Sequence, residues 1–304
     1  MKWEKVKLGN VTDSCLGKML DQNKNKGDYQ PYLANVNVRW GEFDLEDLPL
    51  MKFEESEQER YELKYGDLVI SEGGEPGRCA IWKEQIPNMK IQKALHRVRV
   101  HDCLDYRYLF YWFLLAGKTG ELDQYFTGAT IKHMPGQKLK EVVIDKPPLE
   151  IQHRIADILS AYDDLIENNQ KQIKLLEEAA RRLYKEWFVD LRFPGHENTK
   201  IADGVPEGWR RGLLKELISV NYGKDHKKAP DDGNIPVYGS GGLMRKCNKS
   251  LFSGEAVLIP RKGSLNNIMY VDETFWTVDT MFYVTMKQPH TAVFVYFFVK
   301  AFDM

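Results

Sequence analysis

The chain has 304 residues, and its 43 Lys and Arg residues nearly balance 44 Asp and Glu residues, giving a net charge of −1. This balance excludes a protein whose affinity for nucleic acid comes from a large overall positive charge, but it is compatible with a local basic face. No apolar run reaches the roughly 20 residues of a membrane helix, and the charged N-terminus lacks the apolar core of a signal peptide. We therefore expect a cytoplasmic protein without membrane contact, built from about two domains and a connector.

Residues 1–148 are predicted to form the first globular domain. A run of polar residues follows Gly17, and loops of this composition lie on the surface because they cannot form a core. The loop is either a solvated turn or a finger that contacts DNA phosphates and base edges. Its candidate contact residues are Lys18, Asn23, Lys24 and Lys26.

The stretch YLANVNVRWG (32–41) alternates between apolar and polar residues, which predicts a strand. Asn35, Asn37 and Arg39 would then share one face of that strand. Asn and Arg are side chains that form paired hydrogen bonds with adenine and guanine edges. This face is therefore either a base-reading surface or the solvated side of a half-buried sheet.

Residues 53–82 predict a polar helix, a strand within YGDLVIS (65–71), the turn EGGEPG (72–77) and a returning strand that begins at Arg78. The glycine-rich turn does not match the phosphate-binding pattern G-x-x-x-x-G-K-[ST], and it leads into a strand rather than a helix. We therefore interpret it as a hairpin turn, with Arg78 beside it as a candidate DNA contact.

A further strand is predicted at ALHRVRV (94–100), followed by the aromatic helix DYRYLFYWFLLAG (105–117). Core packing of that helix is the favoured interpretation, and stacking of its rings on bases is the alternative. The domain would close with a Gly/Thr turn that carries Lys132, a strand through residues 142–144, and the pair Pro147–Pro148.

Residues 149–192 are predicted to form a long spacer helix, because they contain no Gly or Pro and their apolar residues recur about every 3.5 positions. Asn169 occupies a seam position, where a polar residue fixes the register of a coiled coil. The width of the apolar face implies a helical partner. The positions expected to contact a partner are Arg154, Ile155, Tyr162, Asn169, Leu176 and Leu183.

Residues 193–208 are rich in Pro, Gly and polar residues and predict a linker, after which the pattern of the first domain starts again. Gly223-Lys224 follows Trp209 at the same spacing as Gly17-Lys18 follows Trp3. Residues 209–304 are therefore predicted to be a second, incomplete domain of the same kind. Its candidate DNA contacts are Lys224, Lys227, Lys228, Tyr238, Ser240, Arg245, Lys246, Arg261, Lys262 and Asn266.

Patterns that would indicate catalysis are missing from the sequence. There is no N-P-P-Y or D-P-P-Y methyltransferase motif, and the His residues and the four Cys residues show no metal-binding or redox spacing. Asp47 with Glu62-Leu63-Lys64 could mimic a D…E-x-K nuclease pattern, but a solvated ion pair explains it more simply. We therefore expect a binding protein that is not itself an enzyme and holds no metal or cofactor.

With the repeat and the helix established, the chain resembles the specificity subunit of a Type I restriction–modification system. The resemblance rests on PPLEIQHRIADILSAYDDLIENN (147–169), LYKEWF (183–188), VPEGW (205–209), IPVYGSGG (235–242) and GATIKHM (128–134). It implies an α+β fold with two α/β target-recognition domains separated by a long coiled-coil helix. Each domain would read half of a bipartite site on double-stranded DNA, and the helix would set the spacing between the half-sites.

The resemblance also implies the partners. The helix would dock methyltransferase subunits, which hold S-adenosylmethionine, and the complex would recruit a restriction and motor subunit that uses ATP and Mg. Family members usually carry a second helical region, which this chain ends without. We therefore expect a truncated product, a fragment, or a short form that pairs with a second copy of itself or with a separate C-terminal half.

An alternative of a different class stays open from the sequence. The chain could be a truncated coiled-coil adaptor or inhibitor that binds methyltransferase subunits without reading a DNA site. The two functions differ in one observable property, which is sequence-specific binding of DNA in the presence of the methyltransferase partner.

Overall fold

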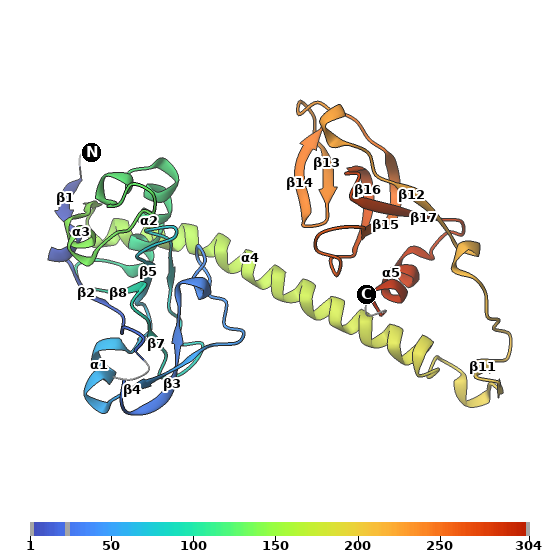
Figure 1. Cartoon of the computed structure of the whole chain (residues 1–304), viewed down its shortest axis with the longest axis horizontal. Coiled ribbons are helices and arrows are strands. Elements are labelled where there is room, and N and C mark those ends of the chain that lie inside the picture. The colour runs from blue at the N-terminus through green and yellow to red at the C-terminus, as the bar shows by residue number, and fades with distance from the viewer. Residues whose placement is uncertain (1–2, 22–24, 302–304) are drawn as a thin grey trace. The chain divides into compact units, whose positions relative to one another are not determined.

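The protein is described by a computed structural model that covers residues 3–21 and 25–301 (Figure 1). The chain divides into two compact units, Met1–Asn169 and Gln170–Met304, which we describe one at a time. Helices and sheets are mixed in the chain, and a long helix is present, so the α+β class expected from the sequence is confirmed. The pairing of that helix with another helix stays a prediction.

The first unit is built on an antiparallel sheet whose strands pack their apolar side chains against an aromatic helix. Its strands in spatial order are β2 (Thr12–Leu16), β8 (Leu95–Val100), β5 (Leu68–Ser71) and β6 (Cys79–Ile81). Helix α2 (Tyr106–Thr119) begins at Asp105, whose carboxylate accepts hydrogen bonds from two backbone N–H groups, and it ends at Gly120 in the left-handed conformation. Phe110 and Phe113 are buried in the core, which confirms core packing over base stacking for this helix.

A second, smaller sheet in this unit carries a separate apolar cluster around Leu33, Trp82 and Ile91. Its strands in spatial order are β4 (Leu50–Phe53), β3 (Asp28–Leu33) and β7 (Lys90–Ile91), and the short helix α1 (Gln58–Tyr61) follows β4 in the chain. The polar helix predicted after residue 53 is therefore only one turn long, preceded by a 3-10 turn.

The strand predicted at 32–41 is wrong for most of its length. β3 ends at Leu33, and a 3-10 helix follows at Asn35–Asn37. The side chain of Asn37 explains the break, because its Oδ1 accepts a hydrogen bond from Ala34 N at 2.9 Å and its Nδ2 donates to Asp44 O at 3.0 Å. Asn side chains often offer the backbone such an alternative to strand pairing.

The first unit closes on the ribbon of β1 (Glu4–Lys7) and β9 (Val143–Lys146), with α3 (Gly136–Glu141) between α2 and β9. The long helix α4 (Leu149–Tyr184) begins directly after this ribbon and continues as a π-helical turn at Lys185–Val189. The predicted helix is confirmed, although its regular α-helical part ends at Tyr184. Beyond the π-helical turn, Arg192 forms an ion pair with Glu186 at 2.6 Å and Leu191 adopts a positive φ of 57°.

The second unit is built on a single mixed sheet, in which β13 and β16 are parallel. Its strands in spatial order are β12 (Ile218–Tyr222), β17 (Met281–Met286), β15 (Phe252–Pro260), β16 (Met269–Thr277), β13 (Ile235–Gly239) and β14 (Gly242–Cys247). Helix α5 (Ala292–Lys300) packs its buried side chains on this sheet, and the predicted linker contains the small ribbon of β10 (Ile201–Ala202) and β11 (Val205–Pro206).

The two units repeat one scaffold. The order β2–β8–β5–β6 in the first unit matches β12–β17–β15–β16 in the second, and a helix follows β8 and β17 alike. Loop hydrogen bonds match as well. Gly17 N donates to Leu95 O at 2.9 Å, and Gly223 N donates to Met281 O at 3.0 Å. The internal repeat predicted from the sequence is therefore confirmed.

A buried histidine is expected to make the first unit sensitive to acid. His96 is 1% exposed on β8, and burial lowers its pKa below 6.5, although a hydrogen bond to Met134 O opposes this. Because the folded pKa lies below the unfolded one, the unfolded chain binds more protons as the pH falls through about 6.5. We expect the free energy of unfolding to decrease from about pH 7.5 to about pH 5.5 in denaturant titrations. His96→Gln should weaken this dependence.

Candidate nucleic-acid interface

The turn between β5 and β6 is held in place by the side chains around it. Asn35 Nδ2 donates to Gly73 O at 3.1 Å, and Arg78 Nη2 donates to Asn35 O at 3.0 Å. Gly74 adopts a φ of 76°, a backbone conformation that is strained for any residue with a side chain. Asn35 and Arg78 were predicted to contact DNA, but in the structure both support this turn. They therefore position its exposed residues instead of projecting as free side chains.

Glu75 is the charged residue that this turn presents. Its Oε1 accepts a hydrogen bond from Trp40 Nε1 at 2.6 Å, and its Oε2 lies 3.3 Å from Arg78 Nη1. The Glu75 side chain remains about half exposed, at 55%. Trp40 lies 35 residues before Glu75 in the chain, so nothing in the local sequence indicates that the carboxylate is fixed.

A second exposed loop lies beside the turn. Thr127 and His133 exchange backbone hydrogen bonds at 2.8 and 2.9 Å, and His133 also bridges to Gly73. Lys132, a predicted DNA contact, is exposed on this loop. Its Nζ lies 3.6 Å from Asp123 Oδ2 and 5.6 Å from the centre of the Phe126 ring.

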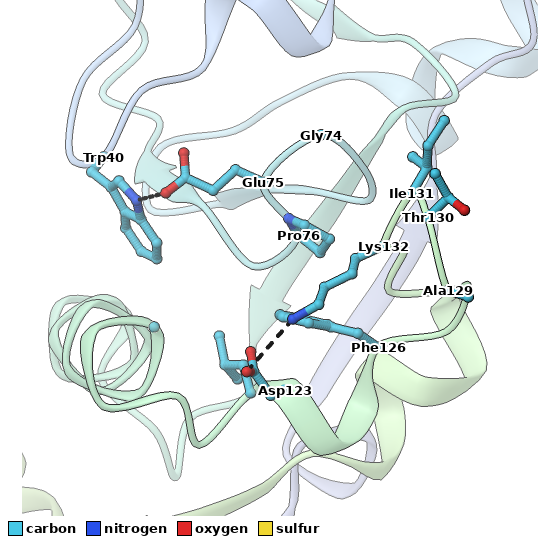
Figure 2. A pocket seen from close by; sticks show the side chains of 12 residues that line it. Trp40, Gly74, Glu75, Pro76, Asp123, Phe126, Ala129, Thr130, Ile131 and Lys132 are labelled. Atoms are coloured by element: carbon cyan, nitrogen blue, oxygen red, sulfur yellow. Dashed lines mark hydrogen bonds and ion pairs between the residues drawn. The ribbon is translucent and has the colours of Figure 1, made fainter.

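The turn and the loop enclose an open cleft of about 550 Å³ (Figure 2). Trp40 lies on the side of the turn and Phe126 on the side of the loop, so aromatic rings line both walls. Charged groups of both signs stand around it, because Glu75, Asp123 and Lys132 all contribute to the lining. A cleft of this composition suits a planar group that carries hydrogen-bond donors.

Burial argues against direct DNA contact for two of the predicted residues in the first unit. Lys18 is 7% exposed, donates a hydrogen bond to Lys52 O at 2.9 Å and forms an ion pair with Glu57. Asn37 is 5% exposed and is bonded to the backbone as described above. Lys26 and Arg39 are exposed, as predicted for surface contacts, whereas Asn23 and Lys24 lie outside the described residues.

The corresponding turn in the second unit, between β15 and β16, is basic. Arg261 lies over the rings of Tyr222 and Phe282, at 4.9 and 5.0 Å from their centres, and its Nη1 donates to Asp279 O at 3.1 Å. Stacking on two rings holds the guanidinium in one orientation while leaving it exposed. Lys262 follows it and is also exposed.

Other predicted residues of the second unit divide into supporting and exposed groups. Arg245 bonds to Asp231 and to the carbonyls of His226 and Ala229, so it fixes a loop. Tyr238 donates to Glu273, and burial together with this carboxylate raises the pKa of Tyr238 to about 12. Ser240 is half-buried, and its carbonyl accepts a hydrogen bond from Asn267 Nδ2. The side chain of Lys228 is not described, and the exposed members are Lys224, Lys227, Lys246, Lys262 and Asn266.

The boundary between the two units lies within helix α4, and the part of the helix in each unit carries exposed apolar side chains. In the first unit Tyr162 and Leu165 are 65% and 56% exposed, and in the second unit Leu176 is 69% exposed. Leu183, Arg154 and Asn169 are exposed as well, so they are open to a partner. Ile155 differs, because it packs against the core of the first unit.

Gln152 is an important residue that sequence reasoning missed. It is 0% exposed on α4, where its Oε1 accepts from Asp105 N at 2.8 Å. Its Nε2 donates to Pro147 O at 2.8 Å and to Cys103 O at 3.2 Å. The side chain therefore joins the start of α4 to the loop before α2 and to the end of β9. A single Gln in a helix that is otherwise mostly solvated gives no local signal of this role.

In the part of the chain that the structure describes, no group of three or more His, Cys, Asp or Glu residues is placed to hold a metal ion. Within the same residues, the helices are too short or too polar for any of them to cross a membrane.

Comparison with known proteins identifies the family. Residues 1–178 match the family model described as "Type I restriction modification DNA specificity domain". The MjaIX specificity subunit of Methanocaldococcus jannaschii is 31% identical over 164 residues, which cover 53% of this chain and 37% of that protein. The MjaVIII specificity subunit of the same organism is 29% identical over 231 residues, which cover 74% of this chain and 51% of that protein. The chain therefore spans about half or less of the length of these relatives.

A solved structure agrees at the level of the fold. The S subunit of the Type I restriction–modification system from M. genitalium superimposes with a TM-score of 0.57 at 18% identity, covering 98% of this chain and 76% of that one. The relatives are specificity subunits of Type I restriction enzymes, and this agrees with the family expected from the sequence. Because the family model covers more than half of its residues, the chain belongs to the Type I restriction modification DNA specificity family.

Proposed function

We propose that this chain is the sequence-reading subunit of a Type I restriction–modification complex, and that each of its units reads one half of a bipartite DNA site. The observation that carries the proposal is the repeat. The same strand order and the same loop hydrogen bonds occur twice, while the exposed side chains of the corresponding turns differ. Two readers on one scaffold with different surface chemistry would recognise two different sequences.

Helix α4 is proposed to bind helical partners. Tyr162 and Leu165 are exposed to water in this chain. A helix that packed on them would remove their apolar surface from water, and such burial contributes about 25 cal/mol per Å². Methyltransferase subunits and a second copy of the chain, or a separate C-terminal half, are the proposed occupants. S-adenosylmethionine, ATP and Mg would be held by the methyltransferase and motor subunits of a cytoplasmic complex.

Selection from a library of randomised DNA duplexes tests the reading function. The full chain, mixed with the methyltransferase subunit of its own system, should enrich duplexes that share two short motifs at a fixed spacing. Enrichment of no motif would refute DNA reading. If the chain still bound the methyltransferase in that case, the adaptor function would replace the one proposed here.

Substitutions on α4 test its role in assembly. Leu165→Glu should raise the dissociation constant for the helical partner roughly tenfold or more, because the buried apolar surface is replaced by a charge that must be desolvated. Light scattering after size-exclusion chromatography, with and without the methyltransferase, measures the change. Lys174→Gln changes the charge by the same amount on the opposite side of the helix and should have little effect. Equal behaviour of both variants would contradict the proposed contact face.

A further inference from the structure

The turns after β5 and β15 can be aligned residue by residue. The pairing of these strands with β8 and β17 places Ile70 and Ile259 at equivalent positions. The glycines that follow at the same distance, Gly74 and Gly263, both adopt positive φ angles, of 76° and 84°. The two turns therefore share a left-handed glycine at the same position.

Each turn also rests on the equivalent part of its own unit. A Cβ atom added at Gly74 would lie 3.0 Å from Asn35, and one added at Gly263 would lie 2.5 Å from Ser240. Asn35 and Ser240 follow the strands β3 and β13, which run parallel to β7 and β16 in the two units. The turns therefore rest on equivalent parts of the two units, while their side chains differ.

The charges on these matching turns are opposite. The first turn carries Glu72 and Glu75, whereas the second carries Arg261 and Lys262. A basic turn suits phosphate oxygens, which bind Lys and Arg regardless of sequence. An acidic turn repels phosphates, so a contact between it and DNA must be made with a base edge that offers hydrogen-bond donors.

The structure prepares Glu75 for such a contact. The Trp40 indole and the Arg78 guanidinium hold its carboxylate at the cleft, and Figure 2 shows the hydrogen bond from Trp40. Lys132 lies across the cleft, but its charge is balanced by Asp123 at 3.6 Å. A fixed carboxylate between aromatic walls therefore offers acceptor oxygens to a planar, uncharged group. In the major groove, carboxylates accept hydrogen bonds from the N4 amino group of cytosine.

We propose that Glu75 is a specificity-determining residue of the first unit and accepts a hydrogen bond from the exocyclic amino group of a cytosine, whereas the equivalent turn of the second unit contacts phosphates through Lys262. This inference rests on the proposed function. It explains why two turns at equivalent positions carry opposite charges. Glu75 would contribute to base preference, and Lys262 would contribute to affinity for any sequence.

Binding to the selected duplex, and to the same duplex with each cytosine of the first half-site replaced by thymine, tests the proposal. The full chain with its methyltransferase partner should prefer cytosine at one position. Glu75→Gln should reduce that preference roughly 10- to 150-fold, because a hydrogen bond to a charged group contributes about 1.5–3 kcal/mol. Gln keeps an oxygen for the Trp40 hydrogen bond, so the fold is retained. Trp40→Phe should reduce the preference less, since the carboxylate remains but is less firmly oriented.

Glu42→Gln is the matched control, because Glu42 is exposed in the same unit and its substitution removes the same charge. The base preference of the Glu42→Gln variant should equal that of the unaltered chain. Lys262→Gln should weaken binding to all duplexes alike and lower the slope of log affinity against log salt by about 1. Retention of every base preference in Glu75→Gln would overturn the inference while leaving DNA reading intact. Failure of the unaltered chain to select any motif would instead overturn the proposed function.

Discussion

Gln152→Leu is expected to destabilise the first unit by about 3 kcal/mol and to loosen the start of α4. The substitution keeps a side chain of similar size but leaves two buried backbone groups, Asp105 N and Pro147 O, without partners, together with the part-buried Cys103 O. Each buried polar group that loses its partner costs about 1–3 kcal/mol, and the three losses add only in part because the groups share one site.

Denaturant unfolding of the unaltered chain and the variant measures the loss, and hydrogen exchange locates it. Protection should fall at Leu109 and at the first turns of α4, where the backbone depends on the loop that Gln152 holds. Arg154→Leu is a suitable control, since it introduces the same side chain at an exposed position of the same helix. Equal stability of the two variants would show that the buried hydrogen bonds of Gln152 contribute little.

Gln152 also shows where sequence reasoning stops. Its place in PPLEIQHRI was part of a motif, and the helix itself was predicted from the absence of Gly and Pro and from the apolar period. The reason for a Gln at that position is tertiary. Its partners come from the loop before α2 and from Pro147, and no pattern within the helix indicates that one polar residue is fully buried among exposed neighbours.

The same limit explains the errors in the first unit. Alternation at 32–41 predicted a strand, but the hydrogen bonds of Asn37 to its own loop terminate β3 at Leu33. Lys18 was expected at the surface because its neighbours are polar. Its burial depends on Glu57, a partner 39 residues later that the sequence could not place beside it.

The candidate site was predictable in outline only. The turn at 72–77 and the exposed loop around Lys132 follow from Gly, Thr and charged residues, which are typical of surface connections. The orientation of Glu75 depends on Trp40 from a different loop, and stacking of Arg261 depends on rings from β12 and β17. Sequence thus indicated which segments are exposed, whereas the structure distinguishes residues that support a turn from those that the turn presents.

The repeat, by contrast, was predictable because equal spacings between residues in the sequence indicate it, without any knowledge of side-chain contacts. Gly17 and Gly223 occupy equivalent positions, directly after the edge strands β2 and β12. There the chain crosses the segment that precedes β8 in the first unit and β17 in the second. At each glycine the backbone passes so close to the backbone of the crossed segment that a side chain has no space. These glycines are therefore part of the frame that both units share.

Gly17→Ala and Gly223→Ala are each expected to destabilise their own unit by about 3 kcal/mol or more, at the upper end of the cost of overpacking. A Cβ at Gly17 would collide with the carbonyl of Gln92, and one at Gly223 would collide with the carbonyl of Val278. Both contacts would be under 3.0 Å, a separation that real Cβ atoms essentially never show. The obstacles are backbone atoms of hydrogen-bonded segments, so they cannot rotate away as a flexible side chain would.

Hydrogen exchange can assign the damage to one unit at a time. Gly17→Ala should reduce the protection of Leu95 and Lys18, whose amides lie in the loop bonds around the collision, and leave the second unit unchanged. Gly223→Ala should do the same at Lys224 and Met281. Gly241→Ala is the control, because its added Cβ meets no atom within 4 Å. If either collision variant were as stable as this control, the close crossing would not be a requirement of the shared frame, and the equivalence of the two units would rest on strand order alone.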